Sequence, residues 1–119
     1  MDLSIIIPLY NEKESLIELN DRIHVNFENT KYTFEVIYVD DGSNDDSWET
    51  ICDLARKYDN IKGISFAKNY GKSQALNAGF KYAKGNLIAT LDADLQDSPD
   101  ELVPMIEMLK KEKLDIVSG

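Results

Sequence analysis

Two aspartates one residue apart, Asp92 and Asp94, follow an apolar run at residues 87–91. We interpret the run as a buried strand because it is short, apolar and preceded by the turn-forming residues 84–86. Open α/β sheets bind ligands outside the carboxyl ends of their strands. Two carboxylates there repel each other unless a cation lies between them, and oxygen ligands suit Mg²⁺ or Mn²⁺. We therefore predict a divalent-metal site at Asp92 and Asp94, with the side-chain carbonyl of Gln96 nearby. A solvated acidic loop is the alternative interpretation.

A second acidic pair, Asp40 and Asp41, follows another apolar segment at residues 34–39. The carboxyl ends of parallel strands meet at one edge of a sheet, so this pair is expected to share its edge with Asp92. We therefore expect Asp40 and Asp41 to contact a ligand.

A lysine, Lys72, lies between Gly71 and Ser73 in a segment that invites comparison with a phosphate-binding loop. That motif requires a glycine five positions before Gly71, where this chain has Phe66, so the comparison fails. Lys72 lies where a helix is expected to begin, and could still meet a phosphate through its charge and the free backbone N–H groups. A solvated lysine is the alternative.

The positions of these residues depend on an alternation of strands and helices. Strands are expected at residues 3–9, 34–39, 61–67, 87–91 and 114–117, and helices at about 12–29, 45–58, 73–83 and from 98 onward. Asn11 is predicted to cap the first helix, with Glu14 as its reciprocal partner. Such alternation predicts an α/β fold with a mainly parallel sheet between two helical layers, in one domain spanning residues 1–119.

Composition excludes several classes of protein. The net charge of −9 argues against nucleic-acid binding through a basic face. The single cysteine, Cys52, leaves no internal disulfide and no zinc signature. No segment is long enough to span a membrane, and the apolar run at residues 3–9 is too short for a signal peptide and lacks a basic leader. A cytoplasmic protein is expected.

Four motifs occur in order along the chain: residues 7–12 (IPLYNE), 39–43 (VDDGS), 69–72 (NYGK) with 75–79 (ALNAG), and 92–94 (DAD). Together they resemble glycosyltransferase family 2, whose members are inverting enzymes with a Rossmann-like nucleotide-diphospho-sugar transferase fold. Residues 92–99 further resemble the polyprenyl-phosphate branch, which includes dolichol-phosphate mannosyltransferases and bacterial undecaprenyl-phosphate glucosyltransferases. The resemblance covers the whole chain but only the first half of a family catalytic domain, so the fold is expected to be truncated.

The resemblance also implies roles for individual residues. Those matching nucleotide-binding positions of the family are Pro8, Tyr10 and Glu12 at the nucleoside, Asp40 and Asp41 at the base and ribose, and Lys72 at the diphosphate. Those matching the metal-binding and catalytic Asp-x-Asp segment are Asp92 and Asp94, assisted by Gln96, and Asp92 is also expected to bind the nucleotide. Ser98 departs from the proline pair that often follows this segment, which is expected to affect the helix start rather than the chemistry.

The implied reaction moves a sugar from a nucleotide-diphosphate donor to an acceptor, with Mg²⁺ or Mn²⁺ as cofactor. The branch implies a polyprenyl-phosphate acceptor; a saccharide hydroxyl in cell-wall or surface polysaccharide synthesis is the alternative acceptor. A non-catalytic nucleotide-binding module is the alternative of another class. A phosphatase using Asp92 and Asp94 is disfavoured, because such sites usually follow the first strand and this pair follows the fourth.

Segments beyond Gly119 are expected to bind the acceptor and to hold any membrane helices. The full-length protein is therefore expected at the cytoplasmic face of a membrane. The last strand, if exposed, could pair with a second copy, so a homo-oligomer is a further expectation.

Overall fold

The computed structural model describes residues 1–94 and 99–112. In chain order the elements are β1 (Leu3–Leu9), α1 (Lys13–Phe27), β2 (Phe34–Asp40), α2 (Ser47–Lys57), β3 (Ile61–Ser65), α3 (Lys72–Tyr82), β4 (Leu87–Thr90), a 3₁₀ turn (Pro99–Glu101) and α4 (Leu102–Glu112). The predicted alternation of strands and helices is confirmed over these residues.

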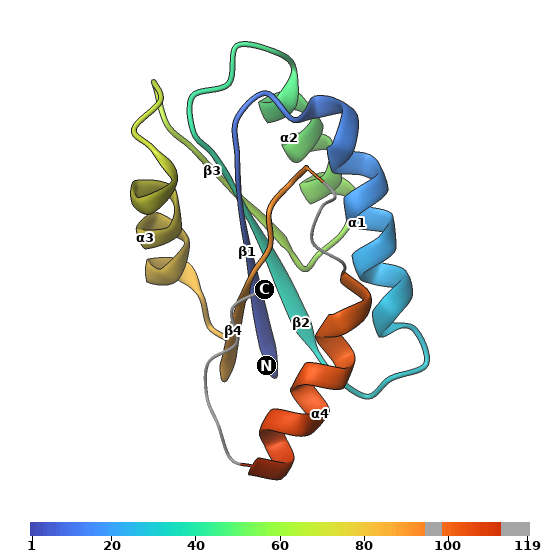
Figure 1. Cartoon of the computed structure of the whole chain (residues 1–119). Coiled ribbons are helices and arrows are strands. Elements are labelled where there is room, and N and C mark those ends of the chain that lie inside the picture. The colour runs from blue at the N-terminus through green and yellow to red at the C-terminus, as the bar shows by residue number, and fades with distance from the viewer. Residues whose placement is uncertain (95–98, 113–119) are drawn as a thin grey trace.

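The four strands form one sheet in the order β3-β2-β1-β4, and every neighbouring pair is parallel (Figure 1). β1 and β2 end level with each other, because Leu9 pairs with Asp40. β4 pairs with β1 only as far as Ile6, opposite Thr90. The carboxyl ends of β1 and β2 therefore extend past the end of β4, which leaves space above it for Asp92.

Helices cover both faces of this sheet, as the sequence predicts. α1, α2 and α4 lie on one face and α3 lies on the other (Figure 1). This is the three-layer arrangement of an α/β domain. Side chains of β1 alternate between the two layers, since successive residues of a strand point to opposite faces.

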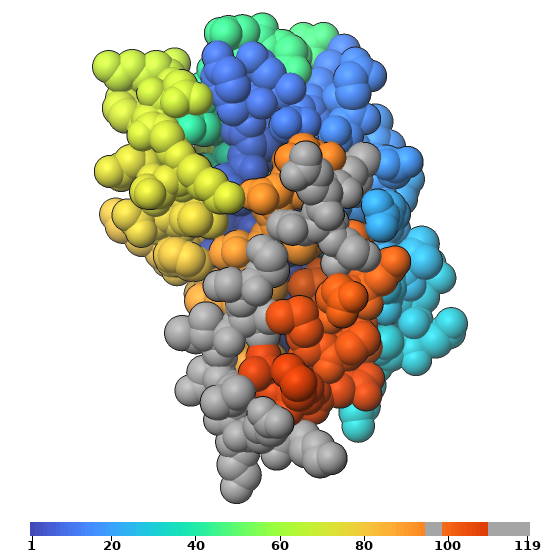
Figure 2. Space-filling model, in the orientation of Figure 1, coloured from blue at the N-terminus to red at the C-terminus, as the bar shows by residue number. Residues whose placement is uncertain are grey.

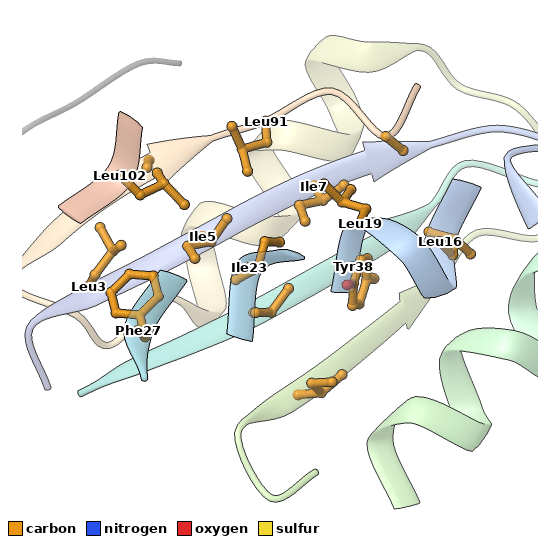
Figure 3. Close-up of a cluster of buried hydrophobic side chains, with 14 of the residues drawn as sticks. Leu3, Ile5, Ile7, Leu16, Leu19, Ile23, Phe27, Tyr38, Leu91 and Leu102 are labelled. Carbon is orange, nitrogen blue, oxygen red and sulfur yellow. The ribbon is translucent and has the colours of Figure 1, made fainter. Parts of the chain in front are cut away.

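The core beneath α1, α2 and α4 is large and almost entirely apolar. Figure 3 shows Ile5 and Ile7 of β1 with Leu19 and Ile23 of α1, all fully buried. Burying each such side chain contributes roughly 1.5–3 kcal/mol. Tyr38 is also buried here and its hydroxyl donates to Asn20 Oδ1 at 2.8 Å. Burial raises the pKa of this hydroxyl above its ordinary value, so it stays a neutral donor.

The core beneath α3 is small. Its buried members are Ile6, Ile37, Val39 and Ala75. Gly79 lets the helix approach the sheet closely, because a Cβ at that position would lie 2.5 Å from Ile6 Cγ2. Small residues of α3 thus lie close to β1, and the partly buried Ile64, Phe66, Leu76 and Ile88 pack around this core.

A buried carboxylate, Glu35, ties the α3 face together. Its Oε2 accepts hydrogen bonds from Ser4 Oγ at 2.6 Å and from the backbone N–H of Lys84 at 2.7 Å, and Lys62 Nζ lies 2.8 Å from Oε1. Burial by itself raises the pKa of Glu35, but the hydrogen bonds from Lys62, Ser4 and Lys84 outweigh it and hold the pKa below its ordinary value. The carboxylate therefore stays charged and joins β2, β3 and the segment after α3.

Element boundaries differ from the predicted ones by a few residues. β3 ends at Ser65, two residues before the predicted end, and α2 begins at Ser47 rather than near residue 45. A 3₁₀ turn precedes α4 in place of a regular first turn. The strand predicted at 114–117, together with Gln96 and Ser98, lies outside the described residues. Within the described ranges, each helix is too short or too polar to cross a membrane.

Candidate functional site

A hollow of about 300 Å³ opens at the carboxyl edge of the sheet, where β1, β2 and the segment after β4 meet the start of α3. Its lining residues are Pro8, Leu9, Tyr10, Asp41, Asn69, Gly71, Lys72 and Asp92. The volume is at the lower end of the range for small-molecule sites. Five of the residues predicted to bind a nucleotide are thus brought together here: Pro8, Tyr10, Asp41, Lys72 and Asp92.

Lys72 and Asp92 form an ion pair at this hollow. Lys72 Nζ lies 2.7 Å from Asp92 Oδ1, although the residues are 20 positions apart in the sequence. Lys72 is the first residue of α3, whose N-terminal end carries the positive end of the helix dipole. The Lys72 side chain is 63% exposed and paired at the same time, so a positive centre already contacts one oxygen of the predicted metal ligand.

The neighbouring Asp94 is exposed and follows Asp92 after one residue. No group of three or more His, Cys, Asp or Glu side chains that could hold a metal occurs among the described residues. Mg²⁺ and Mn²⁺ sites of nucleotide-using enzymes commonly take one or two carboxylates, with the remaining ligands from water and substrate phosphates. Asp92 and Asp94 fit that donor set, and the predicted contribution of Gln96 lies outside the described residues.

Asp41 binds the loop that leads into α3. Its Oδ1 accepts the backbone N–H of Tyr70 at 2.7 Å, and its Oδ2 accepts that of Gly71 at 3.0 Å. Both carboxylate oxygens therefore bind the loop at the residues just before Lys72. The family resemblance implies a place for Asp41 at the base and ribose; in the structure Asp41 lines the hollow and also fixes the loop that enters α3.

Gly42 allows the turn after β2 to pack against this same loop. Its φ is +78°, a backbone conformation that residues with a Cβ adopt only at a cost in free energy. A Cβ at Gly42 would also lie 2.3 Å from the backbone carbon of Lys68 and 2.6 Å from the nitrogen of Asn69. Glycine is therefore required here both by the backbone conformation and by the close approach of the loop.

Asp40 has a different environment from Asp41. It is 2% exposed, and its Oδ1 accepts the backbone N–H of Ser43 at 2.9 Å, which closes the turn after β2. Glu12 accepts a hydrogen bond from Ser15 Oγ at 3.3 Å within the first turn of α1. Within the described part of the chain, neither Asp40 nor Glu12 lines the hollow, unlike the other predicted nucleotide-binding residues.

The prediction that Asn11 caps α1 is wrong. Asn11 has a left-handed backbone, with φ at +53°, and its Oδ1 accepts the backbone N–H of Asn44 at 2.7 Å. Its own N–H donates to Ser43 Oγ at 2.8 Å, and Asn44 Nδ2 donates to the hydroxyl of Tyr10 at 3.1 Å. These bonds join the loop after β1 to the loop after β2. Asn11, Ser43 and Asn44, which hold Tyr10 at the hollow, are not among the site residues predicted from the sequence.

Pro8 is tolerated within a central strand because of the sheet geometry. Proline has no N–H to donate and is normally confined to strand edges. β4 pairs with β1 only up to Ile6, so Pro8 lies past the end of that ladder while still opposite Val39 of β2. The earlier end of β4 also leaves room for the hollow, which Pro8 helps to line.

The sequence of this chain is similar to those of known glycosyltransferases. Residues 4–119 match the profile of a family described as glycosyl transferase family 2. The chain is 40% identical over 116 residues to an undecaprenyl-phosphate 4-deoxy-4-formamido-L-arabinose transferase of Pseudomonas savastanoi, and 43% identical over 116 residues to a transferase of the same name from Yersinia pestis. Each match covers 97% of this chain but 34% and 35% of the relatives. The chain thus spans about a third of the length of these relatives.

The fold is also similar to those of solved structures. Residues 1–349 of S. aureus TarS superpose with a TM-score of 0.79 at 26% identity, covering 95% of this chain and 33% of that one. The same TarS fragment in complex with UDP-GlcNAc gives a TM-score of 0.78. The mannosyltransferase PcManGT of Pyrobaculum calidifontis, in complex with GDP-Man and Mn²⁺, gives 0.78 at 26% identity and covers 90% of this chain and 32% of that one.

Proposed function

The chain belongs to glycosyltransferase family 2, and from this premise we propose that the protein transfers a sugar from a nucleotide-diphosphate sugar to a polyprenyl phosphate, with inversion at the anomeric carbon. The observation that carries the proposal is the pairing of Asp92 with Lys72 at the hollow on the carboxyl edge of the sheet. Asp92 offers a negative group for a metal ion, and Lys72 offers a positive group for a diphosphate.

The donor is proposed to bind across the hollow. Pro8 and Tyr10 offer an apolar and aromatic surface for the base, and the backbone around Gly71 stands at the N-terminus of α3, which favours anions. Relatives of similar fold are described in complex with UDP-GlcNAc and with GDP-Man, which supports a nucleotide-sugar donor without fixing the base.

Asp92 and Asp94 are the residues that we propose hold a divalent cation. They supply hard oxygen ligands, and the protein carries a net charge of −9, so a bound diphosphate needs local positive charge. When bound, Mg²⁺ or Mn²⁺ would act as a Lewis acid toward the diphosphate leaving group. The fold relative in complex with GDP-Man and Mn²⁺ supports a metal of this kind.

Lys72 is proposed to contact the donor diphosphate. In the transfer, an acceptor oxygen forms a bond to the anomeric carbon while the bond from that carbon to the diphosphate oxygen breaks. Negative charge grows on the nucleoside diphosphate, and an ammonium group close to it stabilises that charge. Lys72 already lies at the hollow in contact with Asp92. Its ammonium group would therefore need only a short movement from the Asp92 carboxylate to a diphosphate bound beside it.

The acceptor is proposed to be a polyprenyl phosphate because two of the relatives carry that function in their names, as undecaprenyl-phosphate transferases. A phosphate monoester is already an anion at neutral pH, so it attacks with little help from a general base. Such an acceptor resides in a bilayer, and the complete protein is proposed to work at the cytoplasmic face of a membrane.

Calorimetric titration with UDP, GDP and their sugars, with and without Mn²⁺, tests the donor site. We expect one nucleotide to bind in a metal-dependent manner, and the variant Asp92→Asn/Asp94→Asn to lose at least about 100-fold in affinity, or roughly 3 kcal/mol. The matched control is Asp53→Asn/Asp59→Asn, which removes two exposed carboxylates away from the hollow and should bind like the wild type.

Metal-independent binding that survives in Asp92→Asn/Asp94→Asn would refute the proposed metal site. Radiolabelled sugar transfer to undecaprenyl phosphate, compared with transfer to saccharide hydroxyls, tests the acceptor. Transfer to hydroxyls alone would refute the polyprenyl-phosphate proposal while leaving the donor site intact.

A further inference from the structure

Charge is distributed very unevenly along this acidic chain. Residues 60–91 contain five of its 13 basic residues and none of its 22 acidic residues. The basic residues in this segment are Lys62, Lys68, Lys72, Lys81 and Lys84. All acidic side chains therefore come from the remainder of the chain, and the segment from β3 to β4 is a positive region in a protein whose net charge is −9.

This segment folds into one flank of the molecule, which we call the α3 flank and define as residues 62–84. It comprises residues 62–65 of the edge strand β3, the following loop, and α3, which alone among the described helices covers its face of the sheet (Figure 1). Figure 2 shows the loop and α3 as a continuous yellow surface on the side away from α1. Lys62 and Lys72 bind Glu35 and Asp92, whereas Lys68, Lys81 and Lys84 are exposed.

Aromatic side chains are exposed among these lysines. Tyr70 is 54% exposed, Phe80 is 44% exposed and Tyr82 is 58% exposed. Lys68 Nζ lies 5.4 Å from the centre of the Tyr70 ring. Tyr70 lies in the loop before α3, and Phe80 and Tyr82 lie in its last turn, so large aromatic rings are exposed at both ends of this helix.

The surface between α3 and the edge strand is also hollowed. A hollow of about 440 Å³ is lined by Ile37, Lys62, Gly63, Ile64 and Tyr82. Ile64 belongs to the edge strand and is partly exposed, although it packs against the small core beneath α3. The α3 flank therefore combines apolar side chains, aromatic rings and ammonium groups.

We propose that the α3 flank is the surface through which this protein lies on an anionic lipid bilayer. Tyrosine and phenylalanine suit the boundary between headgroups and acyl chains, and lysines near the surface are attracted to anionic lipids. Charges separated by more than about 8–10 Å of solvent at physiological salt are largely screened. The carboxylates of Glu35 and Asp92, which contact the α3 flank, are paired with Lys62 and Lys72, so the attraction is assigned to the exposed Lys68, Lys81 and Lys84.

This inference rests in part on the proposed function, because a polyprenyl phosphate is found in a bilayer. Lys72 belongs both to the α3 flank and to the lining of the candidate site. Docking through the α3 flank would therefore bring the mouth of that hollow beside the lipid headgroups, where a lipid phosphate must enter.

Sedimentation with vesicles of phosphatidylcholine, with and without one third phosphatidylglycerol, tests the proposal. The wild type should bind only the anionic vesicles, and more weakly as salt rises. The variant Lys68→Glu/Lys81→Glu/Lys84→Glu should lose at least about 100-fold in affinity, since each lysine near an anionic surface contributes about fivefold and each glutamate adds repulsion. The control Lys13→Glu/Lys31→Glu/Lys57→Glu makes the same change in net charge on α1, α2 and the turn after α1, and should lose less than about threefold.

A second pair of variants tests the aromatic contribution. Phe80→Ser/Tyr82→Ser should lose the binding that persists at high salt, whereas Ile17→Ser/Val25→Ser, which removes exposed apolar side chains from α1, should keep it. All of these positions are exposed, and circular dichroism with thermal unfolding checks that each variant folds.

Three results would overturn the inference: no binding of the wild type to anionic vesicles, equal losses in the two lysine variants, or binding to a single-stranded oligonucleotide as tight as to vesicles. Dimerisation of the wild type that the flank variant abolishes, without vesicle binding, would assign the flank to a second copy instead. Vesicle binding does not depend on the nucleotide titration, so the two proposals fail separately.

Discussion

The two faces of the sheet differ in what they are made of. The face beneath α1, α2 and α4 is filled by fully buried leucine and isoleucine side chains such as Leu19 and Ile23. The face beneath α3 has four buried apolar residues, a buried carboxylate at Glu35 and a border of lysines. The same strands supply both faces, because their side chains alternate. One face therefore supplies most of the hydrophobic stabilisation, and the other leaves room for charge and for the entry to the candidate site.

The consequence for function lies in α3. Its inner positions, Ala75 and Gly79, are small, so the helix lies close to β1 with little apolar area buried. Its first residue, Lys72, contacts Asp92, and the loop before it is held by Asp41. Polar contacts therefore hold the loop before α3 and its first residue, and the backbone N–H of Lys84 just after the helix binds Glu35. α1 is held along its length by apolar packing.

The largest expected effect separates the two faces by truncation. Leu19→Ala should lower the free energy of unfolding by about 2–5 kcal/mol, because it leaves a cavity in the large core. Leu76→Ala on α3 should cost only about 1 kcal/mol, since Leu76 is partly exposed and less apolar area is lost. Urea unfolding followed by circular dichroism measures both. Equal losses would show that the two faces stabilise the fold to the same extent.

A second comparison uses the buried carboxylate of the α3 face. Glu35→Gln should lower the free energy of unfolding at neutral pH by about 1–3 kcal/mol, because it disrupts a buried, hydrogen-bonded charge. The pKa of Glu35 is lower in the folded state than its ordinary value of 4.5. Its contribution is therefore present above that value and is lost as pH falls through the folded-state pKa.

Urea unfolding of wild type and Glu35→Gln across the acid range measures this dependence. The difference between the two proteins should shrink as pH falls below the ordinary value of 4.5. Asp53→Asn, which changes an exposed carboxylate on α2, is the control and should follow the wild type. A difference that stays constant with pH would contradict a charged Glu35.

The smallest expected effect concerns the close approach of α3. Gly79→Ala places a Cβ 2.5 Å from Ile6 Cγ2, so Ile6 or the helix must shift. Overpacking typically costs about 1–3 kcal/mol, and alanine returns about 1 kcal/mol of helix propensity, so a net loss of about 1 kcal/mol is expected. Asn77→Ala, at an exposed position of the same helix, should instead be neutral or stabilising. Thermal unfolding compares them; a stabilised Gly79→Ala would show that α3 can move outward at no cost.

Much of the fold could be predicted from local patterns. The short apolar runs at residues 3–9, 34–39 and 87–91 indicate strands that the structure places at Leu3–Leu9, Phe34–Asp40 and Leu87–Thr90. The helical spacing of Leu16, Leu19 and Ile23 likewise indicates α1. The type of each element is encoded by residues close together in the sequence, so a window of ten residues is enough to recognise it. The exact starts of α1 and α2 were less predictable, because Asn11 and Ser43 bond to each other's loops instead of capping their own helices.

For the candidate site, the residue types at the carboxyl ends of the strands, including Asp41 and Asp92, can be read from the sequence, because each follows its own apolar run. The hydrogen-bond and ion-pair partners of these residues can be seen only in the folded chain. Asp41 binds backbone N–H groups 29 and 30 residues away, and Asp92 meets Lys72 across 20 residues. Such partners depend on the strand order β3-β2-β1-β4 and on the earlier end of β4 beside β1, which bring distant loops together at one edge of the sheet. No local pattern of apolar and polar residues specifies that order.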